Sequence, residues 1–374
     1  MNKIVSKVLS SIASLVPTTK MICFSSFPDY TDNAYGIYHY FLKRELNKQF
    51  RLVWVVAEKG RLTEIQNKLK KDAEGISVVY KYSINGIWTY IRSRYVFETH
   101  GMFSALKLKQ HDDKHIALWH GMPLKKIGAS IGQTDCKNCN YLIATSKTYQ
   151  KIMAEAFAKP LEKVLVTGQP RCDLMFEETD WFKTVGIDKS NYQSVGMWMP
   201  TFRKSIVGDI REEGNYNDHA VSFLEEKDMR SLDAVLKEMN ILLLLKIHPM
   251  DALQNSSFDS FSNIFLIKPQ DFHSQLYPLL GACDFLLTDY SSVFIDYLIL
   301  QRPIGFVMND IDNYKNSRGF YFNDLIKILP GPVLQDFDSL CEFIKAPFLV
   351  RNEIDFNANF DNRSSERIWE IIGN

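Results

Sequence analysis

The sequence predicts an α/β protein of two doubly wound domains, each a parallel sheet with helices on both faces. Short apolar segments alternate with amphipathic helical patterns along most of the chain, which is typical of βαβ units. The 374 residues also exceed what a single hydrophobic core usually fills. The alternation loosens into turn residues and charges around Gly168–Asp188. We therefore expect one domain at residues 1–175 and a second at 176–374, facing a central cleft.

Runs rich in aliphatic, β-branched and aromatic residues predict the strands. In the first domain these runs are Met21–Ser25, Leu52–Ala57, Ile76–Tyr80, Tyr95–Glu98, Ile116–His120 and Tyr141–Thr145. Apolar residues at helical spacing predict helices between them, such as Ala34–Gln49 and Leu62–Ala73. In the second domain the predicted strands are Val195–Pro200, Ile241–His248, Ile264–Ile267, Phe285–Thr288 and Ile304–Val307. From Phe337 onward the pattern is helical and polar on one side.

The composition narrows the class of protein. Lys+Arg and Asp+Glu balance at 44 each, so net charge gives no argument for nucleic acid, and no such partner is expected. Six scattered cysteines do not resemble a disulfide framework and favour a reducing, cytoplasmic setting. No run approaches the roughly 18 to 20 apolar residues that span a bilayer. The P-loop and the G-x-G-x-x-G fingerprint are absent, which weakens a kinase and a nicotinamide-enzyme interpretation.

The N-terminus carries an amphipathic helical pattern. Its apolar face consists of Ile4, Val5, Val8, Leu9, Ile12, Leu15 and Val16. Lys3 and Lys7 lie elsewhere, and no acidic residue precedes Asp29. Two interpretations stand equally: a basic helix lying in an anionic membrane surface, or a helix packed on its own domain. The first would make the protein peripheral at the inner face of the cytoplasmic membrane.

A phosphate site is predicted where the strand Phe285–Thr288 ends. Thr288, Asp289, Ser291 and Ser292 lie between that strand and a helical pattern of apolar residues. Unpaired first-turn N–H groups, the helix dipole and two hydroxyls favour a phosphate there. Ligands of open α/β sheets also bind outside the carboxyl ends of strands. We therefore expect these four residues to bind a phosphate-bearing donor.

His120 is the candidate base. It leaves a strand end and is followed at once by Gly121 and by Pro123, so it is expected in a loop at the predicted cleft. Imidazole titrates near neutrality and can take a proton from an alcohol nucleophile. The alternative is a histidine that only hydrogen-bonds the turn. The position at the cleft favours the functional interpretation.

Further basic residues follow other predicted strands. Lys246 and His248 end the most apolar strand, which is expected to be central, and a protonated His248 could neutralise a leaving phosphate. Thr201 and Arg203 follow another strand, and the guanidinium could hold phosphate oxygens in a bidentate fork. Arg318, beyond the last predicted strand, is another candidate donor contact. The alternatives are a solvated strand-end lysine and a basic surface loop.

Other features carry less weight. Cys136 and Cys139 have metal-type spacing, but no second pair lies nearby. His100 and His115 have no supporting neighbours in the sequence. No Asp-x-Asp motif stands out as a metal site, and neither a metal nor a cofactor is expected.

Together, these segments resemble the CDP-glycerol glycerophosphotransferase family of teichoic acid primases and polymerases. The segments that carry the resemblance are ALWHGMPLKKIG (117–128), YLIATSKTYQ (141–150), VTGQPRCDLMF (166–176), MPTFRK (199–204), LLLKIHPM (243–250), DFLLTDYSSVFIDYLILQRPIGF (284–306) and RGFYF with LPGPV (318–333). The resemblance implies a GT-B fold and transfer of a polyol phosphate, with glycerol phosphate preferred, from a CDP-activated donor. The acceptor would be a hydroxyl of a lipid-linked saccharide or polymer, and CMP would leave.

The resemblance also implies residue roles and partners. His120 would be the base, and His248 would bind and neutralise the donor pyrophosphate. Asp289, Ser291 and Ser292 would contact the donor phosphates, and Arg203 and Arg318 match further basic positions. The substrate would be CDP-glycerol or CDP-ribitol, used at the inner face of the cytoplasmic membrane. Two alternatives remain: a GT-B glycosyltransferase that uses a nucleotide sugar for surface polysaccharide, and a non-catalytic envelope-assembly protein.

Overall fold

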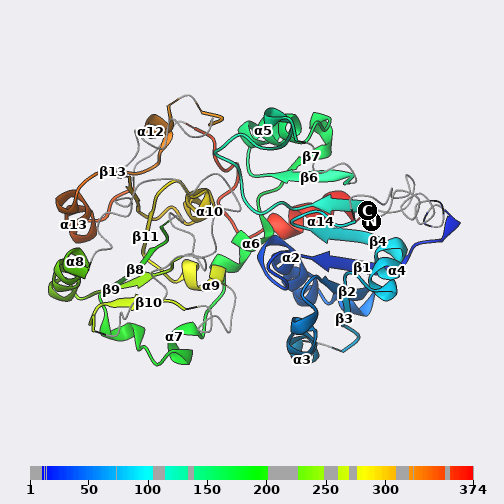
Figure 1. Ribbon diagram of the computed structural model, residues 1–374, viewed down its shortest axis with the longest axis horizontal. Helices are drawn as coiled ribbons and strands as arrows, with labels where there is room; N and C mark the ends of the chain where they lie inside the picture. Colours follow the sequence, from blue (N-terminus) through cyan, green and yellow to red (C-terminus); the bar gives the residue numbers. More distant parts are fainter. Residues whose placement is uncertain are drawn as a thin grey trace. The chain divides into compact units, whose positions relative to one another are not determined.

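The chain folds into two compact units. The computed structural model describes residues 11, 13, 15–72, 74–103, 114–133, 139–200, 226–247, 260–268, 276–308, 320–322, 324–349 and 354–373. The first unit holds the described residues up to Met122, Ile127–Leu174 and the segment from Asp355 onward. The second holds Pro123–Lys126 and Met175–Ile354. Each unit contains one sheet with flanking helices (Figure 1), which confirms the predicted α/β class.

The first unit contains seven parallel strands in the order β3-β2-β1-β4-β5-β6-β7. In chain order its elements are β1 (Thr19–Ser25), α2 (Asp32–Lys43), β2 (Arg51–Val56), α3 (Leu62–Asp72), β3 (Ser77–Tyr80), α4 (Ile84–Arg92), β4 (Ser93–Glu98), β5 (Lys114–Ala117), β6 (Tyr141–Ala144), α5 (Lys147–Ala156), β7 (Val164–Val166), α6 (Pro170–Asp173) and α14 (Ser364–Ile372).

Both faces of the central strand β1 are buried, as a doubly wound sheet requires. Successive residues of a strand point to opposite faces. Phe24 therefore packs into one apolar cluster, with Trp54 and Phe41, whereas Cys23 packs into another, with Tyr90. This two-sided burial explains why β1 and β2 read in the sequence as continuous apolar runs.

The second unit contains six parallel strands in the order β10-β9-β8-β11-β12-β13. Its elements are α7 (Trp181–Thr184), β8 (Ser194–Trp198), α8 (Glu226–Glu238), β9 (Ile241–Leu245), β10 (Ile264–Leu266), α9 (Leu276–Gly281), β11 (Phe285–Thr288), α10 (Val293–Tyr297), β12 (Ile304–Val307), α12 (Leu325–Ile328), β13 (Val333–Leu334) and α13 (Phe337–Lys345). The strand β9 is buried along its whole length between β8 and β10, as its composition predicts.

The strand order of each sheet reverses at its first strand. From β1 the chain moves outward to β2 and β3, and then returns to place β4 on the other side of β1. The second unit repeats this pattern with β8, β9, β10 and β11. Ligands of doubly wound sheets bind beyond the carboxyl ends of the strands at such a reversal. The topology therefore singles out the ends of β1 and β4 in the first unit, and of β8 and β11 in the second.

Several strands differ from the sequence prediction. The strands predicted to run to Pro200 and His248 end at Trp198 and Leu245. The prediction missed β7 and β13, which have only three and two residues. A pattern of apolar residues cannot be recognised in so short a segment. The strand predicted to run through His120 ends at Ala117. Leu118 still donates its N–H to the carbonyl of Glu98 at 2.7 Å, but Trp119 turns into the left-handed region at φ 54°.

The last helix packs with the first unit, whereas the sequence analysis placed all of residues 176–374 in the second domain. Ile368 and Ile372 of α14 are buried in the core of the first unit, and the ring centroid of Trp369 lies 4.8 Å from that of Phe41. The amphipathic pattern indicated a helix, but a pattern alone does not say which core the apolar face covers.

The start of α14 is also held by the first unit. The backbone N–H groups of Ser364 and Ser365 donate to the two carboxylate oxygens of Asp173, at 2.9 and 2.8 Å. These N–H groups have no partner within a helix, and a carboxylate complements the positive end of the helix dipole. Asp173 therefore caps a helix that lies far away in the sequence.

Part of the predicted N-terminal helix is described. Ser11, Ala13 and Leu15 are helical, whereas Ile4, Val5, Val8, Leu9 and Ile12 lie outside the described residues. Ala13 is buried in the cluster that contains Cys23, and Leu15 is 83% exposed. Over the described part of the chain, no helix is long and apolar enough to cross a membrane.

We expect Trp369→Ala to destabilise the first unit by about 3 kcal/mol, because it removes a ring that packs on Phe41, Phe50 and Tyr95. The matched control is Ile371→Ala on the same helix, where the side chain is 52% exposed and the expected change is under about 0.5 kcal/mol. Urea unfolding followed by circular dichroism measures both changes. Equal effects of the two substitutions would contradict the packing of α14 in this core.

Candidate active site

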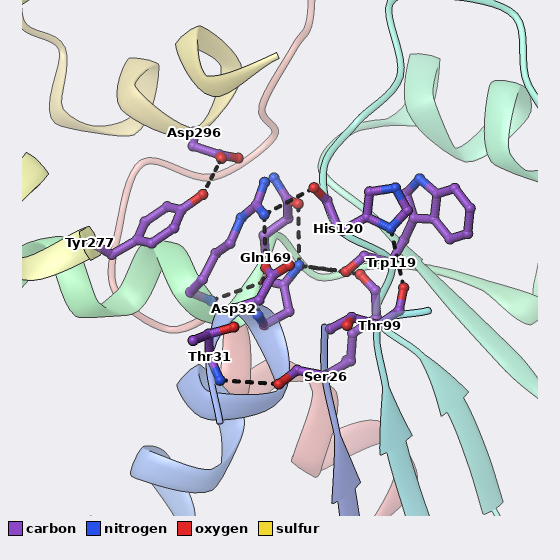
Figure 2. A network of polar contacts seen from close by, with 12 residues as sticks. Ser26, Thr31, Asp32, Thr99, Trp119, His120, Gln169, Tyr277 and Asp296 are labelled. Carbon is purple, nitrogen blue, oxygen red and sulfur yellow. Dashed lines mark hydrogen bonds and ion pairs between the residues drawn. The ribbon is translucent and has the colours of Figure 1, made fainter. Parts of the chain in front are cut away.

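The loop after β5 carries His120 at the carboxyl edge of the first sheet. Trp119 has φ 54° and Gly121 has φ 136°, so the chain reverses sharply around the histidine. Both values lie in a region that side chains with a Cβ rarely occupy. The turn brings His120 next to Thr99, which follows β4 at the strand-order reversal (Figure 2).

The hydrogen bond of His120 sets its tautomer. Its Nδ1 lies 3.3 Å from the backbone carbonyl oxygen of Thr99 (Figure 2). A carbonyl oxygen can only accept, so in the neutral ring the proton is on Nδ1 and Nε2 is the acceptor. A neutral imidazole held in this tautomer can take a proton from an alcohol through Nε2.

Two rings pack against His120. The ring of His100 is stacked on it, with 4.1 Å between centroids and 14° between planes, and Trp119 lies 4.1 Å away at 32°. The His120 side chain keeps an exposed edge. Desolvation by its neighbours is the main cause that lowers its pKa below the ordinary 6.5, partly opposed by the carbonyl of Thr99. His120 is therefore neutral at physiological pH.

A buried polar network holds the backbone on which His120 lies. The Asn33 side chain donates to the carbonyls of Leu118 and Trp119, at 3.3 and 3.0 Å, and accepts from the N–H of Arg171 at 3.1 Å. One guanidinium nitrogen of Arg171 donates to the His120 carbonyl at 3.0 Å. The carbonyls of three successive residues are thus each bonded to a side chain (Figure 2).

The charge of Arg171 is neutralised by Asp32, at 2.8 Å between Nη1 and Oδ1. Asn33 and Arg171 belong to the first turns of α2 and α6, which touch backbone to backbone. A Cβ on Gly36 of α2 would lie 2.4 Å from the carbonyl carbon of Pro170, so only glycine fits there. This close approach brings the two helix starts together beneath the His120 loop.

The second sheet presents the predicted phosphate residues at its own reversal. β11 ends at Thr288, as predicted, and the Thr288 hydroxyl donates to the carbonyl of Met199 at 3.1 Å. Met199 follows β8, so the segments after β8 and β11 are joined at the switch point. Thr288 and Asp289 are buried, and Ser291 and Ser292 are half-buried.

The helix after these serines is short. It begins at Val293, has five residues, and continues as a 3₁₀ helix over Leu298–Leu300. The Val293 N–H donates to the Ser291 hydroxyl at 3.4 Å, so that donor is already engaged. Ser292 occupies the N-cap position without a side-chain capping bond.

Lys246 lies at the same edge, directly after β9. Its N–H donates to the carbonyl of Trp198 at 2.9 Å, and its side chain is half-buried, which lowers the pKa of the ammonium group. The solvated strand-end alternative therefore does not describe it. The other predicted donor contacts, Thr201, Arg203, His248 and Arg318, lie outside the described residues and stay predictions.

The sequence of this chain matches a known protein family. The model of the family CDP-Glycerol:Poly(glycerophosphate) glycerophosphotransferase matches residues 8–374. The chain belongs to this family.

Two curated relatives and a solved structure show the range of these glycerophosphotransferases. The chain is 26% identical to the teichoic acid glycerol-phosphate transferase of Staphylococcus aureus, over 96% of this chain and 95% of that protein. It is 27% identical to the teichoic acid poly(ribitol-phosphate) polymerase of Bacillus spizizenii, over 92% of this chain but 54% of the polymerase. The wall teichoic acid polymerase TagF has a similar structure, with TM-score 0.73 and 25% identity over 98% of this chain and 93% of that one.

The chain therefore spans about half the length of the polymerase from Bacillus spizizenii and nearly all of the transferase from Staphylococcus aureus. A variant of TagF with CDPG also matches, with TM-score 0.71 and 25% identity over 98% of this chain and 93% of that one. This likeness extends through both α/β units, which accounts for the resemblance seen in separate sequence motifs.

Several residues around the candidate base were not found from the sequence. Thr99, Asn33 and Asp32 have no motif of their own, because their role depends on which loops meet in space. Arg171 stands in the segment 166–176 that contributed to the family resemblance, and this was its only signal. His100 was set aside for lack of sequence neighbours, yet it is stacked on His120.

We expect the acid limb of the pH profile of kcat/KM to lie below pH 6.5. The pKa of His120 is lowered, so the neutral, proton-accepting form persists at lower pH than for an ordinary histidine, and activity is lost as pH falls through the lowered pKa. Initial rates of nucleotide release between about pH 4.5 and 8 measure this limb. The range covers about three pH units and includes the ordinary histidine pKa. An acid limb above 6.5 would contradict the desolvated environment of His120.

Proposed function

We propose that this protein transfers a polyol phosphate, preferably glycerol phosphate, from a CDP-activated donor to an acceptor hydroxyl and releases CMP, in wall teichoic acid synthesis. The observation that carries the proposal is His120, a neutral imidazole whose Nδ1 is fixed by the Thr99 carbonyl and whose Nε2 can accept a proton. Family membership supports the donor class.

In the proposed reaction, Nε2 of His120 takes the hydroxyl proton of the acceptor. The acceptor oxygen forms a bond to the β-phosphorus of the donor, and the bond from that phosphorus to the bridging oxygen breaks. CMP leaves with the electron pair of that bond, and His120 leaves the step protonated. The chemistry needs positioning and electrostatic stabilisation, as in other phosphoryl transfers.

We propose that the second unit binds the donor. Ser291 and Ser292 supply hydroxyls at the strand-order reversal, where the Thr288–Met199 hydrogen bond joins the two adjoining segments. Lys246 lies at the same edge of the sheet. Arg203, His248 and Arg318 are proposed on the sequence resemblance to neutralise the charge that accumulates on the departing CMP.

We also propose that the acceptor is lipid-linked and that the protein acts on it at the inner face of the cytoplasmic membrane. Ile84, Trp88 and Arg92 recur every four residues on α4, so they share one helix face. Ile84 is 86% exposed, and the Arg92 guanidinium lies 5.8 Å from the Trp88 ring centre. An exposed apolar stripe ending in a cation suits an anionic lipid interface.

The N-terminal helix supports the same surface. Ala13 of the N-terminal helix and Ile87 of α4 belong to one apolar cluster, whereas Leu15 of the N-terminal helix is largely exposed. The two interpretations of the N-terminal helix are therefore combined in this proposal: one side packs on the first unit, and another is available to lipid.

The function is tested by incubating the protein with CDP-glycerol, CDP-ribitol or UDP-sugars and a synthetic lipid-linked saccharide, and identifying the released nucleotide. We expect CMP, most rapidly from CDP-glycerol. His120→Ala should lower kcat by about 10²–10⁴-fold, because the base is lost. Lys183→Ala, an exposed control in α7, should not change it. UDP release, or a His120→Ala protein with normal CMP release, would contradict the proposal.

For the membrane surface, the test is sedimentation with anionic phosphatidylglycerol vesicles. We expect the double substitution Ile84→Ser and Trp88→Ser to weaken vesicle binding by at least about fivefold, since apolar area at the interface is lost. Ile131→Ser is the matched control, because Ile131 is also exposed, at 54%, but lies apart from α4. Equal binding by all variants would remove α4 from the lipid contact.

A further inference from the structure

His100 packs directly on the candidate base and is not used by the proposed reaction. It follows Thr99 after β4, at the strand-order reversal of the first sheet. Its ring is nearly parallel to that of His120, at 14° and 4.1 Å between centroids. Phe27, from the loop after β1, meets His100 edge-on at 5.5 Å. His100 therefore contacts both the largely exposed ring of Phe27 and the face of the His120 ring.

Thr99 anchors both histidines. Its carbonyl oxygen faces Nδ1 of His120 at 3.3 Å, and its hydroxyl lies 2.8 Å from Nδ1 of His100. The same hydroxyl accepts the backbone N–H of Phe27 at 3.3 Å and can donate its own proton to Nδ1 of His100. One residue thus sets the position of both rings through two different groups.

The carboxylate of Glu98 holds the turn that carries His100. The Gly101 N–H donates to the carboxylate of Glu98, the last residue of β4, and Gly101 has φ 77°. Glu98 is buried, and its other oxygen lies 3.4 Å from Nε2 of His115. Because the turn is tied to the sheet, the backbone that carries the His100 ring is held in place.

Burial, rather than the balance of surrounding charges, favours a neutral pair of rings. Asp32 and Glu98 act to raise both pKa values, whereas Lys81 opposes protonation of His100 and Arg171 opposes that of His120. Burial is the largest cause for both and lowers the pKa of His100 to about 4. Two protonated rings in a stack would also repel each other. The lowered pKa keeps the His100 ring uncharged near neutral pH.

We propose that His100 is a positioning residue that holds the imidazole of His120 in the orientation in which Nδ1 faces Thr99 and Nε2 faces the acceptor hydroxyl. This rests on the proposed role of His120 as the base. Without the His100 ring, the His120 ring can rotate away from the Thr99 carbonyl, and water reaches the face of His120 that His100 covers. The ring then loses both its fixed tautomer and its desolvation, and loose positioning of a catalytic group is costly in rate.

Three variants separate the ring from its hydrogen bond. His100→Phe keeps a flat ring but loses Nδ1. His100→Asn keeps a polar atom within reach of the Thr99 hydroxyl but loses the ring. His100→Ala loses both. We expect kcat to fall by about 10–100-fold in the Ala and Asn variants and by less than about fivefold in the Phe variant, with KM for CDP-glycerol unchanged. A merely structural role would make Phe no better than Asn.

A readout without substrate keeps this test apart from the proposed function. In protein labelled with ¹³C at the histidine ring, the His120 resonance is assigned by its loss in His120→Gln, and its pKa is followed by NMR titration. We expect the pKa to rise toward 6.5 in His100→Ala and to stay low in His100→Phe. An unchanged pKa in His100→Ala would overturn the positioning role, even if CMP release proved the proposed function right. The expected shift in a protein that releases no CMP would support the stack and contradict only the function.

Discussion

The candidate base depends on a single buried cation. Arg171 neutralises Asp32, binds the carbonyl of His120, and receives its own backbone support from Asn33. Removing one partner of a buried ion pair costs about 3–5 kcal/mol, so this arrangement has few alternatives once the chain has folded. The loop after β5, whose φ values at Trp119 and Gly121 are unfavourable for most residues, is held in place by that network. Backbone strain at the site is therefore balanced by buried polar bonds.

The two sheets use the same topology for different tasks. In each sheet the strand order reverses at the first strand, and polar groups collect at the ends of the strands that adjoin the reversal. In the first unit these groups are a neutral imidazole and its supports; in the second they are hydroxyls and a half-buried lysine. The proposed chemistry requires both kinds of group, one to accept a proton and one to hold phosphate oxygens.

The sequence predicted the fold class, most strands and the loop position of His120, because apolar periodicity and chain reversal are local properties. β11 and β12 were placed with their observed bounds. It could not predict that His100 stacks on His120, since the two are brought together by the pairing of β4 with β5. It also assigned α14 to the wrong domain. The spacing of Ile368 and Trp369 shows that one face of the helix is apolar, but not which core that face covers.

The capping of α14 by Asp173 has a consequence for how the chain is assembled. The bonds from Asp173 to Ser364 and Ser365 close loops of 191 and 192 residues, and the segment Met175–Ile354 of the second unit lies inside those loops. On the ribosome, the first unit emerges early but lacks the helix that covers Phe41, Phe50 and Tyr95 until the second unit has been synthesised. Closure of so long a loop is slow and exposes apolar surface in the meantime. The unit that carries the base is therefore the first to begin folding and the last to finish.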